Sequence, residues 1–175
     1  QLARRGIPER HAERMRIVLR HAHGIIANSA DSLDTLSSFA GQEGLALPPS
    51  LVAPLGVTSL TVRSDQKAPL TGAYFVVLGT IEGRKNHLLL LHVWRRLIER
   101  LGAAAPRLVI IGQRGWCAEE VFTQLDHDLT LRSHVIEVGP CDDDTLSAYM
   151  AHARALLFPT FVEGQGLPLT EALAA

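Results

Sequence analysis

The sequence predicts an α/β protein whose larger part is a parallel sheet with helices on both faces. Short, continuously apolar runs alternate with longer segments of helical periodicity, a pattern typical of strands buried on both faces. The runs lie at 74–78, 107–111, 135–138 and 155–158. A glycine or proline follows each run: Gly79, Gly112, Gly139 and Pro159. We expect the loops that begin there to share the carboxyl edge of the sheet, where such sheets bind ligands.

Three segments are expected along the chain: a remnant of a first domain at 1–57, a linker at 58–72 and the main domain at 73–175. The linker is polar and interrupted by Pro69. The first segment predicts a β-α-β unit with strands at 24–27 and 51–55. Ser29 or Asp31 can cap its helix, which is expected to run to about Phe39.

Residues 1–22 are basic and have helical periodicity, which leaves two interpretations. The helix could lie on a membrane surface. We favour an ordinary surface helix, because its apolar stripe contains no Trp or Phe.

In the main domain, helices are expected from about 86 to 101, from 118 to 131 and from 143 to 151. The inner side of the first helix is expected to carry a stripe of large apolar residues. These are Leu89, Leu90, Val93, Leu97 and Leu101.

The composition excludes several classes of protein. A net charge of -1 over 175 residues argues against a nucleic-acid partner. Cys117 and Cys141 are too few for a disulfide framework or a Cys-rich zinc site. No apolar run approaches the roughly 20 residues of a membrane span, and no signal peptide is recognised, so a cytoplasmic setting is expected. Because the sequence starts with Gln and ends in helical composition, we expect a piece cut at both ends.

The strongest chemical motif is the run from Glu163 to Glu171. A Gly-x-Gly turn, Gly164-Gln165-Gly166, leads into a helix with Pro168 near its start. Such a turn lets backbone amides approach an anion, and the helix start adds partial positive charge. Glu163 and Glu171 bracket the turn as acceptors for sugar hydroxyls. The alternative, weighed equally, is a simple glycine-rich turn with Glu171 as a carboxylate near the helix start.

A second motif, from Gly79 to Asn86, contains adjacent Arg84 and Lys85 just before a helix. Cations at a helix start oppose its dipole, so counter-charge for a diphosphate explains them better than helix stability does. The alternative is an exposed basic pair. The segment is neither a Walker loop nor a dinucleotide-binding fingerprint.

Together these runs resemble glycosyltransferase family 4. The matching segments are Gly79-Thr-Ile-Glu-Gly-Arg-Lys-Asn-His87, Leu108-Val-Ile-Ile-Gly-Gln-Arg-Gly-Trp116, Phe158-Pro-Thr160 and Glu163-Gly-Gln-Gly-Leu-Pro-Leu-Thr-Glu171. The resemblance spans about residues 50–175. It implies a GT-B architecture of two Rossmann-like lobes, with a nucleotide sugar bound mainly by the second lobe, and retention of anomeric configuration.

The resemblance also implies residue roles. Glu163 would contact the donor sugar and Glu171 the ribose, while Lys85 and Arg84 would hold the diphosphate and stabilise its charge. The amides of Gly164, Gln165, Gly166 and Leu167 would complete that site. Gly79 and Thr80 would line the donor pocket, and the loop at Cys141 would meet the base. Thr80 stands where many members carry Arg, and Gln165 where Phe is usual.

By resemblance, the expected function is transfer of a hexose, mannose or a related sugar, in surface polysaccharide assembly. The expected partners are a nucleotide sugar and a glycan or lipid-linked acceptor, with contact at the inner face of a membrane as a further expectation. No cofactor is expected. Two alternatives are a piece that binds nucleoside diphosphates without catalysis, and a GT-B sugar-nucleotide epimerase. The paired glutamates with Arg84 and Lys85 argue against the epimerase.

The remaining polar clusters are assigned ordinary roles. Asp142-Asp143-Asp144 is interpreted as a helix cap rather than a metal site. The eight histidines are scattered, so no metal site is expected. Cys117 and Cys141 are taken as ordinary thiols, and Trp116 as a packing residue.

Overall fold

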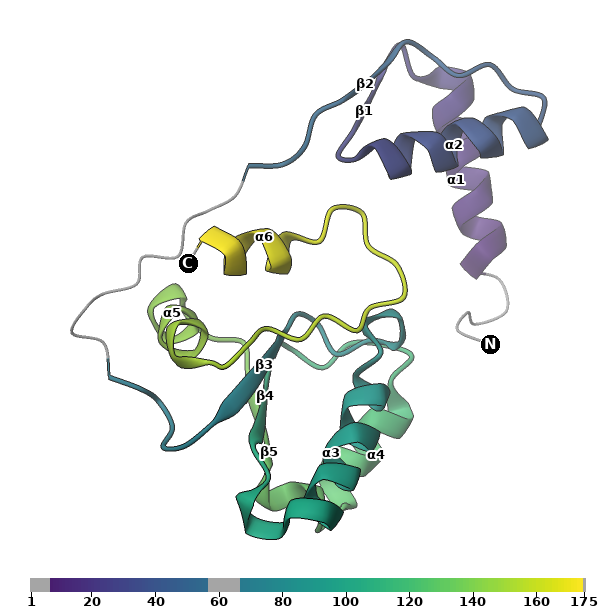
Figure 1. The fold of residues 1–175 in the computed structure, drawn as a ribbon. Helices are drawn as coiled ribbons and strands as arrows, with labels where there is room; N and C mark the ends of the chain where they lie inside the picture. Colours follow the sequence, from purple (N-terminus) through teal and green to yellow (C-terminus); the bar gives the residue numbers. More distant parts are fainter. Residues whose placement is uncertain (1–6, 57–66, 175) are drawn as a thin grey trace. The chain divides into compact units, whose positions relative to one another are not determined.

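The computed structural model describes residues 7–56 and 67–174, which form two compact units. Unit 1 contains the described residues up to Gly56 together with Glu163–Gly166. Unit 2 contains the remaining described residues. The predicted linker, 58–72, lies largely outside the described residues. Figure 1 shows the elements of each unit.

Unit 1 is built around a short parallel β-α-β motif. Its elements are α1 (Ile7–His21), β1 (Ile25–Ala27), α2 (Ala30–Gln42) and β2 (Ser50–Val52). Strands β1 and β2 pair in parallel, with Ile25 opposite Ser50. The Ser29 hydroxyl caps α2 by accepting a hydrogen bond from the Ser32 amide at 3.1 Å. The predicted β-α-β order is confirmed, and the second strand is shorter than expected.

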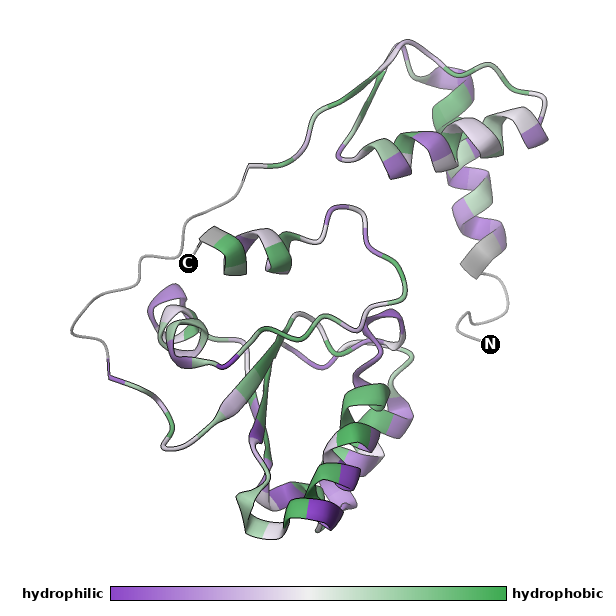
Figure 2. Ribbon diagram, viewed as in Figure 1, coloured by the Kyte–Doolittle hydropathy of each residue, from purple (hydrophilic) through white to green (hydrophobic). Residues whose placement is uncertain are grey.

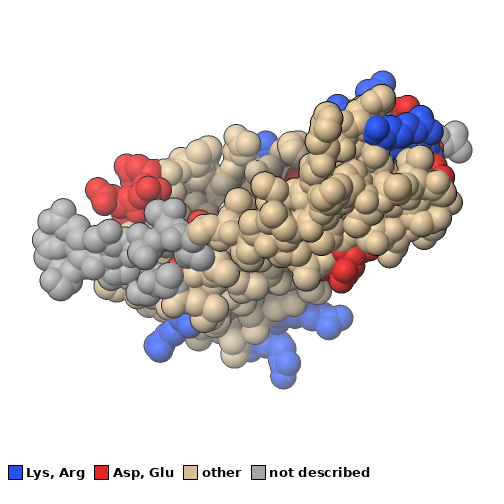
Figure 3. All heavy atoms as spheres, turned by 90° about the horizontal axis from the view of Figure 1, so that it is seen from above, with Lys and Arg blue, Asp and Glu red and all other residues tan. Residues whose placement is uncertain are grey.

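Helix α1 contacts the end of α2 through an ion pair. The Arg16 guanidinium donates to both Glu43 carboxylate oxygens, at 2.8 and 2.9 Å, and to Glu13 at 3.2 Å. This pairing lowers the pKa of the exposed Glu43. Part of the positive charge of α1 is thus balanced within the unit. On the surface seen in Figure 3, the described basic side chains lie in small separate groups.

Unit 2 is a three-stranded parallel sheet in the order β3-β4-β5. The strands are β3 (Tyr74–Leu78), β4 (Arg107–Ile111) and β5 (Val135–Gly139). Strand β3 pairs with β4 from Tyr74 opposite Arg107 to Leu78 opposite Ile111. The three predicted runs are therefore strands in parallel register, as the sequence predicts.

The fourth apolar run, 155–158, only begins a strand. Leu156 bridges to Val76, and the Leu157 amide donates to the Val76 carbonyl at 2.7 Å. The expectation of a full strand is wrong. Pro159 has no amide hydrogen, so the pairing cannot be extended in that direction.

Helices cover both faces of the unit 2 sheet. Helices α3 (His87–Leu101) and α4 (Glu119–His127) lie against one face, and α5 (Asp143–His152) against the other (Figure 1). Alternate strand residues divide between two apolar clusters. Val77, Leu108 and Ile110 face α3 and α4, whereas Tyr74, Val76 and Val109 face α5. Figure 2 shows the hydrophobic colouring of these strands and of the inner helix surfaces. The chain ends in α6 (Leu167–Ala174).

The predicted inner face of α3 is confirmed for Leu90 and Leu97, which lie in or against the core, and wrong for the other three residues. Leu89, Val93 and Leu101 are exposed, whereas Leu90, Leu91 and Trp94 are buried. The run of four leucines at 88–91 gives no unique stripe. Trp94 selects the orientation, because its buried indole donates a hydrogen bond to the Pro106 carbonyl at 2.8 Å.

Helix α4 also ends earlier than predicted. The Asp128 carboxylate accepts hydrogen bonds from the Thr130 and Leu131 amides at 2.9 and 3.3 Å. Such side-chain bonds to the backbone compete with helix continuation, so the chain passes into a short 3₁₀ turn, Leu131–Ser133.

Among the described residues, no helix has the length and apolar character to cross a membrane.

Candidate donor-binding site

Three glycines end the three strands of unit 2 and define its carboxyl edge. Gly79, Gly112 and Gly139 have positive φ angles of 125°, 148° and 75°. The Gly79 amide donates to the Ile111 carbonyl at 2.9 Å, and the Gly112 amide to the Gly139 carbonyl at 3.1 Å. A Cβ at Gly112 would lie 2.2 Å from the Gly79 carbonyl oxygen, so no side chain fits there. The predicted shared edge is confirmed.

Thr80 is held tightly in the loop after β3. The next residue, Ile81, is fully buried, and its amide donates to the Gln113 carbonyl at 2.9 Å. A Cβ at Gly115 would lie 2.5 Å from the Thr80 Cγ2 atom. The loops after β3 and β4 are therefore in close contact, and Thr80 lies next to Gly115 of the loop after β4.

Lys85 lies at the carboxyl end of β3 and is almost completely buried, with 8% of its surface exposed. Its Nζ lies 3.3 Å from the position of a Cβ on Gly79, so glycine leaves room for the amine. The same Nζ lies 5.5 Å from the centre of the Phe158 ring, a cation–π contact. Burial argues against the exposed basic pair that the sequence left open.

Arg84 is placed differently, with 46% of its side chain exposed. Its Nε lies 2.7 Å from the buried carboxylate of Glu82, and its Nη1 donates to the Val162 carbonyl at 2.9 Å. Glu82 is not among the residues that the motifs single out. The available signal was a carboxylate two residues before the basic pair.

His87, the first residue of α3, is another buried residue to which the sequence motifs assign no role. It is 1% exposed, and neither ring nitrogen has a hydrogen-bond partner among the described residues. Burial, and then the nearby Lys85 charge, lower the pKa of His87 to about 4. The imidazole is therefore neutral at physiological pH and adds no charge beside Lys85.

Cys141 and Glu171 both lie near the start of α5. Burial, and then Asp142 and Asp143, raise the pKa of the Cys141 thiol. Burial, and then Asp143, raise the pKa of Glu171. Asp143, the first residue of α5, thus contributes to the raised pKa of both groups.

The run of three aspartates, 142–144, lies at the start of α5, and its first residue caps the helix. Asp142 Oδ1 accepts a hydrogen bond from the Thr145 amide at 2.8 Å, which lowers the pKa of that carboxyl group. In the part of the chain that the structure describes, no group of three or more His, Cys, Asp or Glu could hold a metal ion. The capping interpretation is confirmed for Asp142.

The predicted glycine turn belongs to unit 1. Gln165 forms two hydrogen bonds with the Leu55 backbone: Oε1 accepts from the amide and Nε2 donates to the carbonyl, both at 2.8 Å. A Cβ on Gly164 would lie 3.1 Å from Asn28 Nδ2. Gly166 has a φ of 74°. Glu163–Gly166 thus close unit 1, whereas Leu167 and Glu171 belong to unit 2 with Lys85.

Trp116 does not pack as predicted. Its side chain is 65% exposed, while Ala118 is buried in the core instead. Cys117, with a φ of 55°, turns the chain between them, and the Trp116 carbonyl accepts from the Gly83 amide at 3.3 Å. The backbone of Trp116 is anchored to the Arg84 loop, and its ring stays at the surface.

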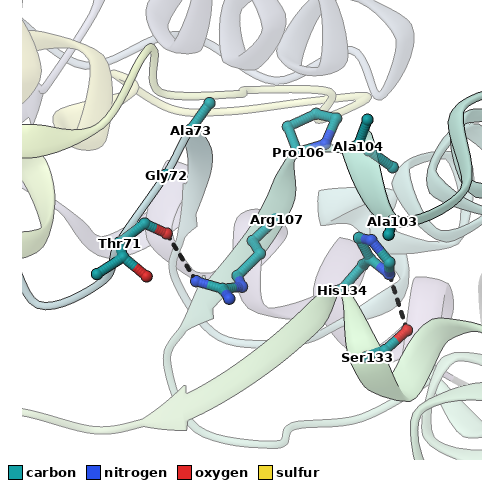
Figure 4. Close-up of a pocket in the computed structure, with 10 residues that line it drawn as sticks. Thr71, Gly72, Ala73, Ala103, Ala104, Pro106, Arg107, Ser133 and His134 are labelled. Carbon is teal, nitrogen blue, oxygen red and sulfur yellow. Dashed lines mark hydrogen bonds between the residues drawn. The ribbon is translucent and has the colours of Figure 1, made fainter.

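A cavity of about 360 Å³ lies at the opposite, amino edge of the unit 2 sheet (Figure 4). In this cavity Arg107 donates to the Thr71 carbonyl at 2.8 Å, and Ser133 lies 2.8 Å from His134 Nδ1. None of the predicted site residues lines it.

Most of the chain, including the carboxyl edge of the unit 2 sheet, matches a known protein family. The family is glycosyl transferases group 1, and it matches residues 60–175. The chain belongs to this family. The chain is 30% identical over 182 residues to the O-antigen chain mannosyltransferase B of Escherichia coli, covering 95% of this chain and 47% of that relative. It is 26% identical over 167 residues to the serotype-specific mannosyltransferase WbdA of the same species, covering 87% of this chain and 20% of that relative.

Solved structures have the same fold as this chain. Anabaena Alr3699/HepE, in complex with UDP and glucose, superposes with a TM-score of 0.71 at 17% identity, covering 95% of this chain and 47% of that one. The pneumococcal O-GlcNAc transferase GtfA, with UDP and GlcNAc, gives 0.69 at 17% identity, covering 90% and 30%. The Rossmann-like fold of GT-B glycosyltransferases is thereby confirmed. The chain spans about half of mannosyltransferase B and a fifth of WbdA.

Proposed function

We propose that this chain supplies the donor-binding part of a retaining family 4 hexosyltransferase. The enzyme transfers mannose or a related sugar from a nucleoside-diphosphate donor to a glycan or lipid-linked acceptor in surface polysaccharide assembly. The mannosyltransferase names of the relatives support the sugar class. The buried Lys85 beside Gly79, at the ligand-binding edge of the sheet, carries the proposal.

Lys85 has the properties of a diphosphate-binding cation. Burial excludes water, which strengthens its attraction for an approaching anion. As the donor bond breaks, negative charge grows on the departing nucleoside diphosphate, and a fixed ammonium group stabilises that charge without reorganising. Neutral His87 adds no competing positive charge beside the amine. This chemistry uses no metal, and we propose that the enzyme works without a cofactor.

The remaining roles follow from the motif. We assign Glu163 to the donor sugar, Glu171 to the ribose, and Cys141 to the side of the base. Gly79 and Thr80 line the diphosphate pocket, and the amides of Gly164, Gln165, Gly166 and Leu167 contribute donors to it. A cytoplasmic enzyme that works at the membrane periphery fits a lipid-linked acceptor.

The test is a binding screen with uridine, guanosine and adenosine diphosphates and their hexose derivatives, read by calorimetry. We expect the nucleoside diphosphate of one base to bind. Lys85→Gln should weaken its affinity about tenfold to a hundredfold, which is the contribution of a charge-assisted hydrogen bond. Arg96→Gln, an exposed arginine on α3, is the matched control and is expected to bind as wild type. Equal affinity of wild type and Lys85→Gln would contradict the assignment.

A transfer assay separates the enzymatic proposal from its alternatives. Labelled donor is incubated with the chain and with acceptor glycans, and the anomeric configuration of any product is determined by NMR. Binding without transfer or hydrolysis would favour a non-catalytic diphosphate-binding role. A changed sugar nucleotide formed without acceptor would favour the epimerase.

A further inference from the structure

Glu82 is a buried acidic residue that the donor-binding roles leave unused. Only 5% of its side chain is exposed, and its Oε1 lies 2.7 Å from Arg84 Nε. Burying a carboxylate carries a desolvation cost that offsets much of the attraction to its partner. Such a pair is therefore weak evidence for stability, and it points to a role in fixing local geometry.

Arg84 also holds the segment 159–162 against the turn before α3. Its Nη1 donates to the Val162 carbonyl at 2.9 Å. Its backbone carbonyl accepts from the Phe161 amide at 2.9 Å and from the Thr160 hydroxyl at 3.1 Å. Asn86 Nδ2 donates to the Pro159 carbonyl at 3.2 Å. Every residue from 159 to 162 is thus bonded to the turn, and the next residue is Glu163.

We propose that Glu82 and Arg84 are positioning residues that act as a clasp. The Glu82 carboxylate fixes the Arg84 guanidinium, which fastens residues 160–162 of unit 2 against the turn before α3. Lys85, whose amine lies beside Gly79 and Phe158 instead, is the cation that binds phosphate. Only this last statement rests on the proposed function, because the clasp itself needs no ligand.

The chemistry of the guanidinium makes the proposal testable. Its planar fork donates to the Glu82 carboxylate from Nε and to the Val162 carbonyl from Nη1 at the same time. A lysine amine is a single point charge and cannot reproduce both directions. Arg84→Lys therefore keeps the charge and breaks the clasp, whereas a residue needed only for its charge would tolerate the change.

The first experiment is amide hydrogen exchange on the unliganded chain. We expect Arg84→Lys and Glu82→Gln each to accelerate exchange of the Phe161 amide about tenfold, with the β4 amides unchanged. Lys85→Gln should leave Phe161 unchanged. Arg114→Lys is the matched control, because Arg114 pairs with Asp126 and Glu137 at 2.6 and 2.7 Å at the same edge. If the Arg84→Lys variant loses protection from exchange throughout β4, its unit 2 is unfolded. The isosteric Glu82→Gln variant then provides the test of the clasp. Wild-type exchange at Phe161 in the folded variants would overturn the clasp.

The second experiment is calorimetric titration with inorganic pyrophosphate, which avoids any dependence on the base. We expect Lys85→Gln to weaken binding at least tenfold, and Arg84→Lys and Glu82→Gln to weaken it by a smaller, similar factor. If Arg84 were instead a phosphate ligand restrained by Glu82, Glu82→Gln would strengthen binding, and that result would overturn the positioning role. If pyrophosphate does not bind the wild-type chain, the proposed function fails, while the exchange data still decide the clasp.

Discussion

The two edges of the unit 2 sheet are made from the same strands but carry different chemistry. At the carboxyl edge, glycines with positive φ bring loops into direct contact, and Lys85, Glu82 and His87 are buried there. At the amino edge, Gly72 and an alanine-rich turn surround a cavity, and the Arg107 guanidinium donates to the Thr71 backbone carbonyl. Burying ionisable side chains such as Lys85 and Glu82 carries a desolvation cost, and the amino edge has no comparable buried group among the residues that line its cavity.

The largest expected difference between the edges is steric. Gly112→Ala would force a Cβ to 2.2 Å from the Gly79 carbonyl oxygen, so we expect unit 2 to lose about 3 kcal/mol or more of unfolding free energy. Gly72→Ala at the amino edge meets no atom within 4 Å and has only its φ of 83° to accommodate, about 1–2 kcal/mol. Urea denaturation measures both. Equal losses would show that the carboxyl edge is no more tightly packed.

The next difference concerns pH. His87 has a folded-state pKa of about 4, below its ordinary value of 6.5, so the unfolded chain binds the extra proton between these pH values. As far as His87 is concerned, the free energy of unfolding should be at its maximum above pH 6.5. It should fall by up to about 3 kcal/mol as the pH drops to 4. His87→Gln should flatten this dependence, measured by denaturation across that range. His134→Gln, at the amino edge, should keep it; a slope that persists in His87→Gln would contradict the assignment.

The smallest expected effect tests the cap before α5. Asp142→Ala should lower the melting temperature slightly because it removes the cap, whereas Asp142→Asn, which can still accept from the Thr145 amide, should lower it much less. Thermal unfolding measures both. Added EDTA or manganese should change neither result; a metal-dependent shift seen only in the wild type would restore the metal interpretation of the aspartate run.

The fold was largely predictable because its signals are local. The continuous apolar strands at 74–78 and 107–111, the glycine after each, and the Ser29 cap each follow from a short stretch of sequence. The phase of α3 was not predictable, because four consecutive leucines fit several faces and the hydrogen bond from Trp94 to Pro106 comes from tertiary packing.

The sequence places Arg84 and Lys85 together after β3, but it does not reveal that their side chains have different surroundings. Lys85 and Arg84 are adjacent and chemically similar in the sequence, yet one is buried beside Gly79 and the other is bound to Glu82 and Val162. The difference depends on a residue 78 positions away, which no local pattern encodes. Trp116, predicted as a packing residue, is likewise exposed although its residue type is typical of packing.

The hydrogen bonds between Gln165 and Leu55 have a consequence for synthesis. They join residues 110 positions apart, both within unit 1. A ribosome releases Leu55 long before Gln165, so these bonds cannot form until the strands of unit 2 that lie between them in the sequence have emerged. Domains generally fold in the order in which they are made. Here the β1–β2 part of unit 1 is translated before the unit 2 sheet, yet the backbone of Leu55 gains its partner only after that sheet has been synthesised.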